Sequence, residues 1–250
     1  VLPALDKCFL RHPNGLRLVR RFFDDMFESR ISKGIIGCDS WAWAYLKRVA
    51  PSCPTTAVTL QAFDPKKLAR WFSALAVSSG NPPFFFRQSD NGKYVISPDA
   101  EKENDEKPTE FTYFIRHLAG FSRGIPGVAL ALWAKALRNT PESTDEKLEF
   151  NPENTIWVHP WEKMQRPAMP AAPGSEPAVV LHTLLIHNGL NMEMLNRLIT
   201  LPPHGVEQAI RTFADNELVE SADNVWRVSA AGYPAVRQYL SGEGYLVDEF

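Results

Sequence analysis

The chain has 250 residues, of which 44% are hydrophobic and 22% charged, and its formal net charge is −2. This composition is ordinary for a soluble globular protein, and the length gives room for about two domains. The near-neutral charge gives no overall signature of nucleic-acid binding. The sequence contains no apolar run long enough to span a bilayer and no visible signal peptide.

The cysteines and the first residues give two further expectations. Cys8, Cys38 and Cys53 are odd in number and form no CxxC pair, which predicts reduced thiols and a cytoplasmic location. The sequence does not begin with Met and opens directly in an apolar run, Val1-Leu2-Pro3-Ala4-Leu5. We therefore expect a fragment of a longer protein.

Residues 1–50 show the beginning of an alternating pattern. Residues 16–30 predict an amphipathic helix, because their apolar side chains recur at helical spacing. Residues 33–38 (KGIIGC) predict a short buried strand, and either Asp39 or Ser40 can cap the helix predicted at residues 41–49. On that helix, Trp41 and Trp43 point to different sides and are interpreted as core or interface anchors.

The alternation continues to residue 76. Residues 55–62 (TTAVTLQA) are rich in β-forming side chains and predict a second strand. Asp64-Pro65 predicts a helix start, with Asp as the N-cap and Pro at the first helical position. Strand, helix, strand, helix is typical of an α/β layer, so residues 1–76 are expected to be part of an α/β core.

Residues 77–107 break this pattern. Phe84–Arg87 and residues 93–96 flank Asn91-Gly92, which predicts a hairpin. Two alternatives remain for the phenylalanines at 84–86. At least one ring is exposed and suits a protein contact, or the rings are buried under the following loop. Residues 97–108 are polar and charged and predict a mobile loop.

Residues 108–163 form a predominantly helical region in this interpretation. Helices are predicted at residues 110–119 and 128–137, separated by a Gly- and Pro-containing turn, and a short strand at residues 155–159. Residues 164–177 are rich in Pro and Ala and predict a linker.

Residues 178–250 carry the pattern on which the fold prediction depends. Helices are predicted at residues 180–188, 191–201 and 203–216, then strands at 218–221 and 225–229, and a last helix at 231–240. Three helices followed by a two-stranded wing resemble a winged helix-turn-helix domain.

The charge of this segment weighs against DNA binding. It contains nine acidic residues and four arginines, a net of about −5, and so lacks the cations that bind phosphates. Its presumed recognition helix offers His204, Gln208 and Arg211 as nucleic-acid contacts. We expect a protein-docking role ahead of DNA recognition.

The order of the elements resembles the second half of a P-loop ATPase of the AAA+ or STAND kind. Residues 1–6 (VLPALD) would end the Walker B strand, and residues 33–40 would be the sensor strand. Residues 58–68 look like the last core strand entering a helical lid. Gly124-Ile125-Pro126 is similar to the lid GxP motif, and a winged helix often follows the lid in this family.

The resemblance implies roles for particular residues. Asp6, Asp39, Ser40 and Arg48 would be catalytic, with Arg48 in the place of an arginine finger. Arg123, Gly124 and Pro126 would bind the nucleotide, with Arg123 as a second sensor. For both arginines the alternative is an ordinary surface ion pair.

The sequence also departs from the family. It contains no GxxxxGK[ST] loop, and Asp6 is followed by Lys7 where a second acid is usual. ATP and magnesium are therefore expected only in a full-length parent that supplies the Walker A segment, and the chain alone is expected to be inactive and to bind no cofactor. The six histidines show no HxxxH or HExxH spacing, so no metal site is predicted.

The leading hypothesis is that lid and winged helix of an ATP-dependent switch transmit the nucleotide state to a protein partner, or act through self-association. One alternative is a winged-helix DNA-binding regulator, and another is a non-catalytic interaction module. The hypothesis further predicts that residues 35–38 and 58–61 lie side by side in one parallel sheet.

Overall fold

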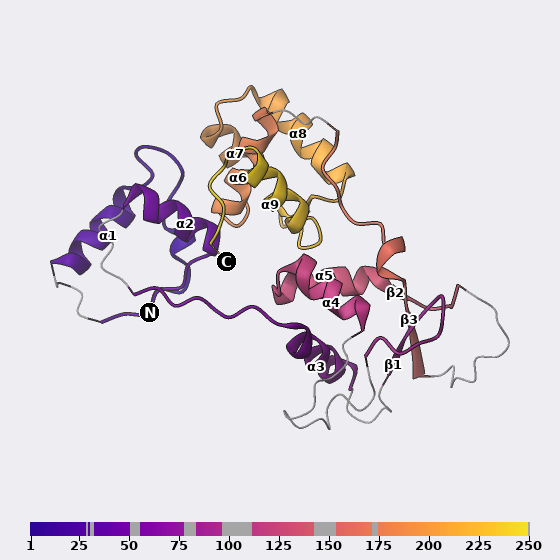
Figure 1. Cartoon of the computed structure of the whole chain (residues 1–250). Coiled ribbons are helices and arrows are strands. Elements are labelled where there is room, and N and C mark those ends of the chain that lie inside the picture. Colours follow the sequence, from indigo (N-terminus) through magenta and orange to yellow (C-terminus); the bar gives the residue numbers. More distant parts are fainter. Residues whose placement is uncertain are drawn as a thin grey trace. The chain divides into compact units, whose positions relative to one another are not determined.

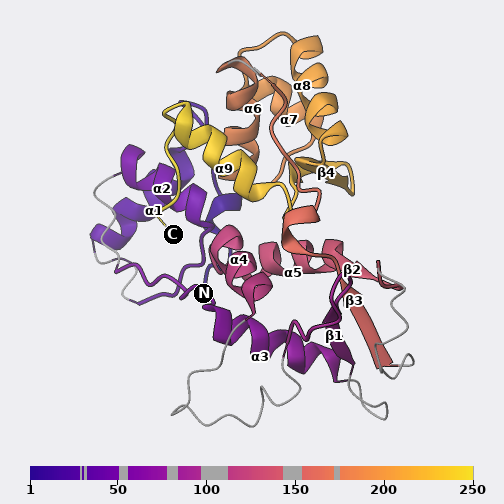
Figure 2. The same cartoon turned by 45° about the vertical axis from the view of Figure 1, so that its right-hand side comes forward.

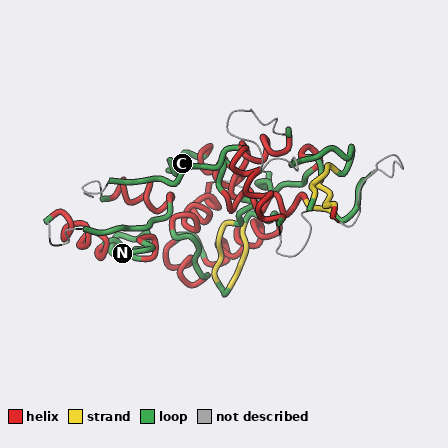
Figure 3. The backbone as a smooth tube through the Cα atoms, turned by 90° about the horizontal axis from the view of Figure 1, so that it is seen from below, coloured by secondary structure: helices red, strands yellow, loops and turns green. Residues whose placement is uncertain are grey.

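The computed structural model describes residues 1–28, 30, 33–50, 56–77, 84–96, 112–142, 154–171 and 175–249. The chain divides into two compact units (Figure 1): unit 1 is Val1–Thr59 with Pro167–Phe250, and unit 2 is Leu60–Arg166. Most of the described chain is helix and loop, and its strands are confined to small groups (Figure 3). The prediction of a mixed α/β fold is confirmed at this level.

The N-terminal part of unit 1 is built from a short 3₁₀ helix, η1 (Leu5–Lys7), and the helices α1 (Arg17–Phe27) and α2 (Ser40–Val49). The helix α1 packs through Val19 and Phe23, which are buried on one face with Phe22 and Met26 partly buried beside them. Leu18 and Phe27 of the same helix are exposed. The buried residues of this core are Leu5, Phe9, Leu16, Val19, Phe23, Ala42, Leu46 and Ile186. Because Ile186 is the last residue of the helix α6 (Ser175–Ile186), this core joins the N-terminal residues to the C-terminal part of unit 1.

The C-terminal part of unit 1, residues 175–249, is named the C-terminal module here. Its elements are α6 (Ser175–Ile186), α7 (Met192–Leu198), α8 (Pro203–Asp215), β4 (Val219–Ala222), β5 (Val225–Val228) and α9 (Tyr233–Gly242). β4 and β5 pair antiparallel, with Val219 opposite Val228, and Leu190 adds one bridge to Trp226. The three helices, two strands and last helix expected in this segment are confirmed as elements.

Two local features fix the hairpin of the C-terminal module. Asp223 and Asn224 at its tip have φ values of +51° and +61°, a conformation that Asx residues tolerate and that matches the twist of the strands. Gly189 has a φ of +99°, and a Cβ atom there would lie 2.9 Å from Val225 Cγ1. Gly189 therefore lets the loop after α6 approach β5.

Unit 2 combines three helices with a small sheet. The helices are α3 (Pro65–Ala76), α4 (Tyr113–Ser122) and α5 (Pro126–Ala136), and the strands are β1 (Phe85–Gln88), β2 (Leu137–Arg138) and β3 (Thr155–Val158), followed by the 3₁₀ helix η3 (Trp161–Lys163). β3 lies between β1, to which it is parallel, and β2, to which it is antiparallel. Helices α4 and α5 pack together, and α3 packs on α4 (Figure 2).

Buried aromatic rings hold unit 2 together. Trp133 stacks on Phe72 with ring centroids 4.7 Å apart and meets Phe86 and Phe114 edge-on. Trp161 of η3 meets Phe114 at 5.7 Å. Such pairs add to the free energy gained by burying their area, so α3, α4, α5 and β1 share one core.

Most local predictions for unit 2 are confirmed. Asp64 caps α3 by accepting a hydrogen bond from the Lys67 amide (2.7 Å), and Pro65 opens the helix. The turn through Asn91-Gly92 brings Arg87 opposite Tyr94 in an antiparallel bridge. Phe84 is exposed and Phe86 is buried, while the predicted loop at residues 97–108 lies outside the described residues.

The predicted α/β core is wrong in two of its strands. Within residues 33–38, only Ile36 takes part in a bridge, and its partner is Leu2. The described residues of the second predicted strand, 56–62, form no strand, and the side chains of Val58 and Leu60 are 89% and 84% exposed. The expected pairing of residues 35–38 with 58–61 is therefore absent from the described structure, because β-forming side chains make a strand only where a partner strand is available.

The division into units also differs from the predicted organisation. Residues 1–59 belong with the C-terminal module, and α3 belongs to unit 2 instead of the N-terminal core. The second boundary, between Arg166 and Pro167, falls inside the predicted linker. Two cores connect residues 1–59 to the C-terminal module: Trp41 is buried among the apolar side chains of the module, and Ile186 is buried in the N-terminal core.

The sequence also bears on two further features, membrane-spanning segments and disulfide bonds. No helix among them combines the length and apolar character needed to cross a bilayer. Of the cysteines, Cys8 and Cys38 are described and neither forms a disulfide, whereas Cys53 lies outside the described residues.

Candidate functional site

Two extended segments place Asp6 and Asp39 at the same end of a short parallel pair. The Gly37 amide donates to the Leu2 carbonyl (2.8 Å), next to the bridge between Leu2 and Ile36. A Cβ atom at position 37 would lie 2.3 Å from a carbonyl oxygen of the facing segment, so this close approach requires glycine. Because parallel segments run in the same direction, the acids that follow them, Asp6 and Asp39, belong to one edge.

Asp6 is buried, and Asp39 is partly buried. Asp6 is 6% exposed, and its Oδ2 lies 3.7 Å from Lys7 Nζ. Asp39 caps α2 by accepting a hydrogen bond from the Trp41 amide (2.9 Å). Burial raises the pKa of Asp39 above its usual value, the charges of Asp6 and Asp248 raise it further, and the amide donors at the start of α2 oppose both effects.

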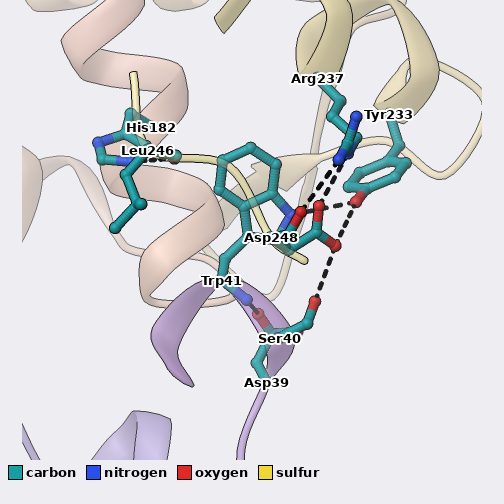
Figure 4. A network of polar contacts seen from close by, with 8 residues as sticks. All are labelled: Asp39, Ser40, Trp41, His182, Tyr233, Arg237, Leu246 and Asp248. Atoms are coloured by element: carbon teal, nitrogen blue, oxygen red, sulfur yellow. Dashed lines mark hydrogen bonds and ion pairs between the residues drawn. The ribbon is translucent and has the colours of Figure 1, made fainter. Parts of the chain in front are cut away.

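Ser40 is connected to the C-terminal module through Asp248 (Figure 4). Its Oγ donates to Asp248 Oδ2 (3.0 Å), and the Tyr233 hydroxyl donates to the same oxygen (2.9 Å). Arg237 Nε donates to Oδ1 (2.8 Å), and its Nη2 donates to the Asp248 carbonyl oxygen (3.0 Å). Asp248 is 2% exposed, so this network supplies the partners that a buried carboxylate needs.

The same network keeps Tyr233 protonated. Burial raises the pKa of its hydroxyl, and the neighbouring Asp248 carboxylate raises it further. Tyr233 is therefore a donor to Asp248 at all ordinary pH values, and it also accepts a hydrogen bond from Trp41 Nε1 (3.1 Å). Ser40 and Trp41 of α2 thus hold one end of a continuous chain of contacts to α9.

Trp41 is the apolar part of this connection. It is 3% exposed and packs among the core residues of the C-terminal module. Its ring lies edge-on to Tyr233 and His182, with centroids 6.4 Å and 6.0 Å away. The interpretation of Trp41 as a core or interface anchor is confirmed.

His182 of α6 joins the loop before α1 to the C-terminal tail, residues 244–249. Arg11 Nη1 lies 3.2 Å from His182 Nδ1, and the other ring nitrogen lies 3.0 Å from the Leu246 carbonyl oxygen. Arg11 is a donor and a carbonyl is an acceptor, so the neutral ring accepts at Nδ1 and donates at Nε2. Burial, and secondarily the charge of Arg11, lower the pKa of His182 to about 4.

His187 makes a second contact of the same kind. Its Nε2 accepts from the Arg11 amide (3.2 Å), and its carbonyl oxygen accepts from Lys7 Nζ (2.6 Å). Burial, then the charges of Lys7 and Arg11, lower the pKa of His187 to about 4. Both histidines are therefore neutral near pH 7, and both sit where the N-terminal segment packs on α6.

Arg48 is not part of this cluster. It is exposed in the last turn of α2, whereas Asp39 and Ser40 lie at the beginning of that helix. Arg48 lies eight positions after Ser40, which is about 12 Å along the helix axis. At this end of a helix a cation interacts favourably with the helix dipole, which is the structural alternative to a catalytic role for Arg48.

Arg123, Gly124 and Pro126 belong to unit 2. Arg123 ends α4 in a left-handed conformation (φ +55°), and its Nε is buried with no hydrogen-bond partner in the described residues. Gly124 follows with a φ of +68°, and its carbonyl accepts from the Phe63 amide (2.8 Å). Pro126 is the first residue of α5. The turn thus packs on the segment that leads into α3.

We expect Gly124→Ala to destabilise unit 2 by about 2–3 kcal/mol, because it combines left-handed strain with a steric clash. A Cβ atom at position 124 would lie 2.3 Å from the Phe63 carbonyl oxygen. Gly120→Ala on α4 is the matched control, since a Cβ there meets nothing within 4 Å. It should stabilise the helix by up to about 1 kcal/mol. Thermal unfolding followed by circular dichroism measures both, and equal melting temperatures would contradict the role of Gly124.

The predicted nucleic-acid contacts are exposed on one side of α8. His204, Gln208 and Arg211 are accessible, and so are the acidic residues Glu207 and Asp215 beside them. Arg211 is the only basic residue that this helix contributes. The exposed side of α8 therefore lacks the positive charge typical of a phosphate-binding helix.

Sequence reasoning found the α2 side of the cluster and missed the rest. Asp39 and Ser40 were identified by the resemblance, but Tyr233, Arg237 and Asp248 were not. Asp248 follows three apolar residues in a segment without periodicity, and its partner Ser40 is more than 200 positions away in the chain. The sequence marks Asp248 only as an acidic residue that follows the run Tyr245-Leu246-Val247.

The described residues include no group of three or more His, Cys, Asp or Glu side chains placed to hold a metal ion. Comparisons of the chain with the models of known protein families, with curated proteins and with solved structures each give no match.

Proposed function

We propose that this chain is the C-terminal part of an ATP-driven switch protein similar to AAA+ and STAND ATPases. The observation that carries the proposal is the connection from the predicted sensor residues to the C-terminal module. Ser40 binds Asp248, which is held by Arg237 and Tyr233 of α9. A residue pair that senses nucleotide state would act directly on α9 through this connection.

Two further observations support the proposal. The parallel bridge between Leu2 and Ile36 puts the predicted Walker B segment beside the predicted sensor segment, with Asp6 and Asp39 at one edge. The turn at Gly124 packs on the entrance to α3, as expected of a lid motif next to the segment entering the lid. The absence of strand structure at residues 56–62 is the main departure from the family pattern.

The described residues do not by themselves fit magnesium or a phosphate group. Asp39 accepts from the start of α2, and the Ser40 hydroxyl donates to Asp248. The sequence also lacks the glycine-rich loop that would surround the phosphates. In the proposal, other parts of the parent protein bind the nucleotide, and this chain converts its presence into movement.

The coupling works through geometry. A shift of about 1 Å in the segment ending at Asp39 and Ser40 takes the contact to Asp248 out of hydrogen-bond range. Asp248 would keep Tyr233 and Arg237 but lose one of its donors in a buried position, which favours a second arrangement of α9 and the C-terminal tail. The acidic C-terminal module would present this change to a protein partner, since it lacks the charge for DNA.

A longer protein that includes the preceding sequence provides the test. We expect ATP hydrolysis, and we expect Arg48→Ala and Arg123→Ala to lower its rate by about tenfold or more if they stabilise the transferred phosphoryl group. Arg197→Ala is the matched control, because Arg197 is exposed and, among the residues that the structure describes, makes its ion pair with Glu193 of the same helix. Unchanged rates in both test variants would remove these arginines from the mechanism.

The coupling has a separate readout. Addition of a non-hydrolysable ATP analogue should change the protease sensitivity of the C-terminal tail. Asp248→Asn should abolish that change while hydrolysis persists, whereas Asp215→Asn on the exposed side of α8 should leave it intact. Failure of the longer protein to bind ATP would overturn the proposed function itself.

A further inference from the structure

The first half of α1 presents three arginines to solvent. Arg17, Arg20 and Arg21 are exposed, while Val19 and Phe23 of the same helix are buried in the core. None of the three arginines makes an ion pair with a residue in the described part of the chain. They are therefore cations on a firmly packed helix with their guanidinium groups available to solvent.

Their order along α1 is unfavourable for the helix. Cations lie in its first half, and Asp24, Asp25 and Glu28 lie at its end, which is the reverse of the arrangement that the helix dipole favours. A base four residues before an acid is also the weaker orientation of a helical ion pair. In the structure, Asp25 and Glu28 contact Arg30 instead. Helix stability therefore does not explain these arginines.

A fourth arginine extends the cluster beyond the helix. Burial raises the pKa of the Tyr45 hydroxyl, and the charges of Arg11 and Arg20, which both act on that hydroxyl, oppose this effect in part. Arg11 is held in place by Thr183 and His182. Arg11, Arg17, Arg20 and Arg21 are named the basic face here. Residues 1–50 contain nine bases and five acids, a net of +4, whereas residues 178–250 have a net of about −5.

We propose that the basic face binds the sugar–phosphate backbone of nucleic acid without recognising its sequence. Guanidinium groups bind phosphate oxygens in a bidentate manner, and a backbone contact needs exposed cations and no apolar pocket. A protein partner would need a cluster of apolar anchors, whereas the two exposed apolar side chains of α1, Leu18 and Phe27, lie in different halves of the helix. This inference does not depend on the proposed switch. It makes the basic face, and not α8, the candidate nucleic-acid surface.

The test uses the full chain and a fluorescein-labelled mixed-sequence DNA duplex of 20 base pairs, with fluorescence anisotropy at pH 7. If about three phosphates are contacted, affinity should fall about 40-fold between 50 and 200 mM NaCl. Arg17→Glu/Arg20→Glu/Arg21→Glu should weaken binding at the lower salt by about tenfold or more and flatten the salt dependence. Arg197→Glu/Arg211→Glu/Arg227→Glu makes the same change of charge at exposed positions of the C-terminal module, and it should leave affinity nearly unchanged.

The variants also separate binding from folding. Glutamate in the first half of α1 suits the helix dipole, but it also places like charges four residues before Asp24 and Asp25. The two effects oppose each other, so the first triple variant should melt close to the temperature of the unaltered chain while binding less. Arg17→Gln/Arg20→Gln/Arg21→Gln repeats the test without charge reversal. No binding at 50 mM NaCl, or equal losses in both charge-reversed triples, would overturn the inference. Equally tight binding of a polyglutamate peptide would assign the basic face to an acidic protein instead.

Discussion

Trp41→Ala is expected to destabilise unit 1 by about 4 kcal/mol, which is a large fraction of the stability of an ordinary domain. The indole is 3% exposed among the core residues of the C-terminal module, and its Nε1 donates to the Tyr233 hydroxyl. Truncation leaves a cavity at the place where α2 joins α6 and α9, and it removes a hydrogen bond. Hydrogen exchange followed by mass spectrometry should show loss of protection first in α2, α6 and α9.

Trp43→Ala is the control for this prediction. Trp43 lies two positions further along α2 and is only half-buried, so its truncation should cost about 1 kcal/mol and leave the exchange pattern unchanged. Urea titration followed by circular dichroism gives both free energies without relying on tryptophan fluorescence. Similar costs for the two variants would mean that Trp41 does not anchor α2 to the C-terminal module.

The helices of this fold could be predicted because their signals are local. Asp39 before α2 and Asp64-Pro65 before α3 each act within four residues, and both acids are N-caps in the structure. The hairpin between β4 and β5 was predicted for the same reason, from a polar tip between two β-forming runs. These features depend on neighbours in the sequence alone.

Strand pairing and the polar cluster could not be predicted in this way. Residues 56–62 have a β-forming composition, but whether they form a strand depends on a partner that no local pattern reveals. The parallel pairing of β1 with β3 joins Phe85 to Thr155, 70 positions apart in the sequence. Asp248 meets Ser40 across a still longer separation. Such long-range contacts produce no periodic pattern in the sequence of either segment.

Only part of the candidate site could therefore be predicted from the sequence. The resemblance to P-loop ATPases identified Asp6, Asp39 and Ser40, and the structure places Asp6 and Asp39 close enough for their charges to interact. It does not bring Arg48 to them, because that residue is at the far end of α2. The groups that complete the cluster, Arg237 and Tyr233, belong to α9. The sequence predicts this helix but assigns no function to its residues.

Acidification from pH 7 to pH 4 is expected to remove about 5 kcal/mol of stability from unit 1 through two histidines. Burial lowers the pKa of His182 and of His187 to about 4, against an ordinary value near 6.5. As pH falls below 6.5, the unfolded chain binds protons at both rings while the folded chain does not. Stability is thus fully present above pH 6.5 and is lost progressively down to pH 4.

Unit 2 provides an internal reference for this measurement. Hydrogen bonds from Lys163 and Ser89 lower the pKa of Glu142 to about 2, so its contribution is lost only as pH falls below 4.5. At pH 5, hydrogen exchange should therefore show weakened protection in α6 and α2 while α4 and α5 remain protected.

His182→Gln/His187→Gln should flatten the pH dependence of unit 1 between pH 6.5 and 4, even though lost packing lowers its stability at pH 7. His12→Gln/His204→Gln alters two exposed histidines and should leave the slope as it is. Urea titrations at half-unit steps of pH give the slope for each variant. A slope in the first variant equal to that of the unaltered chain would show that His182 and His187 are not kept neutral where α6 meets Arg11 and Lys7.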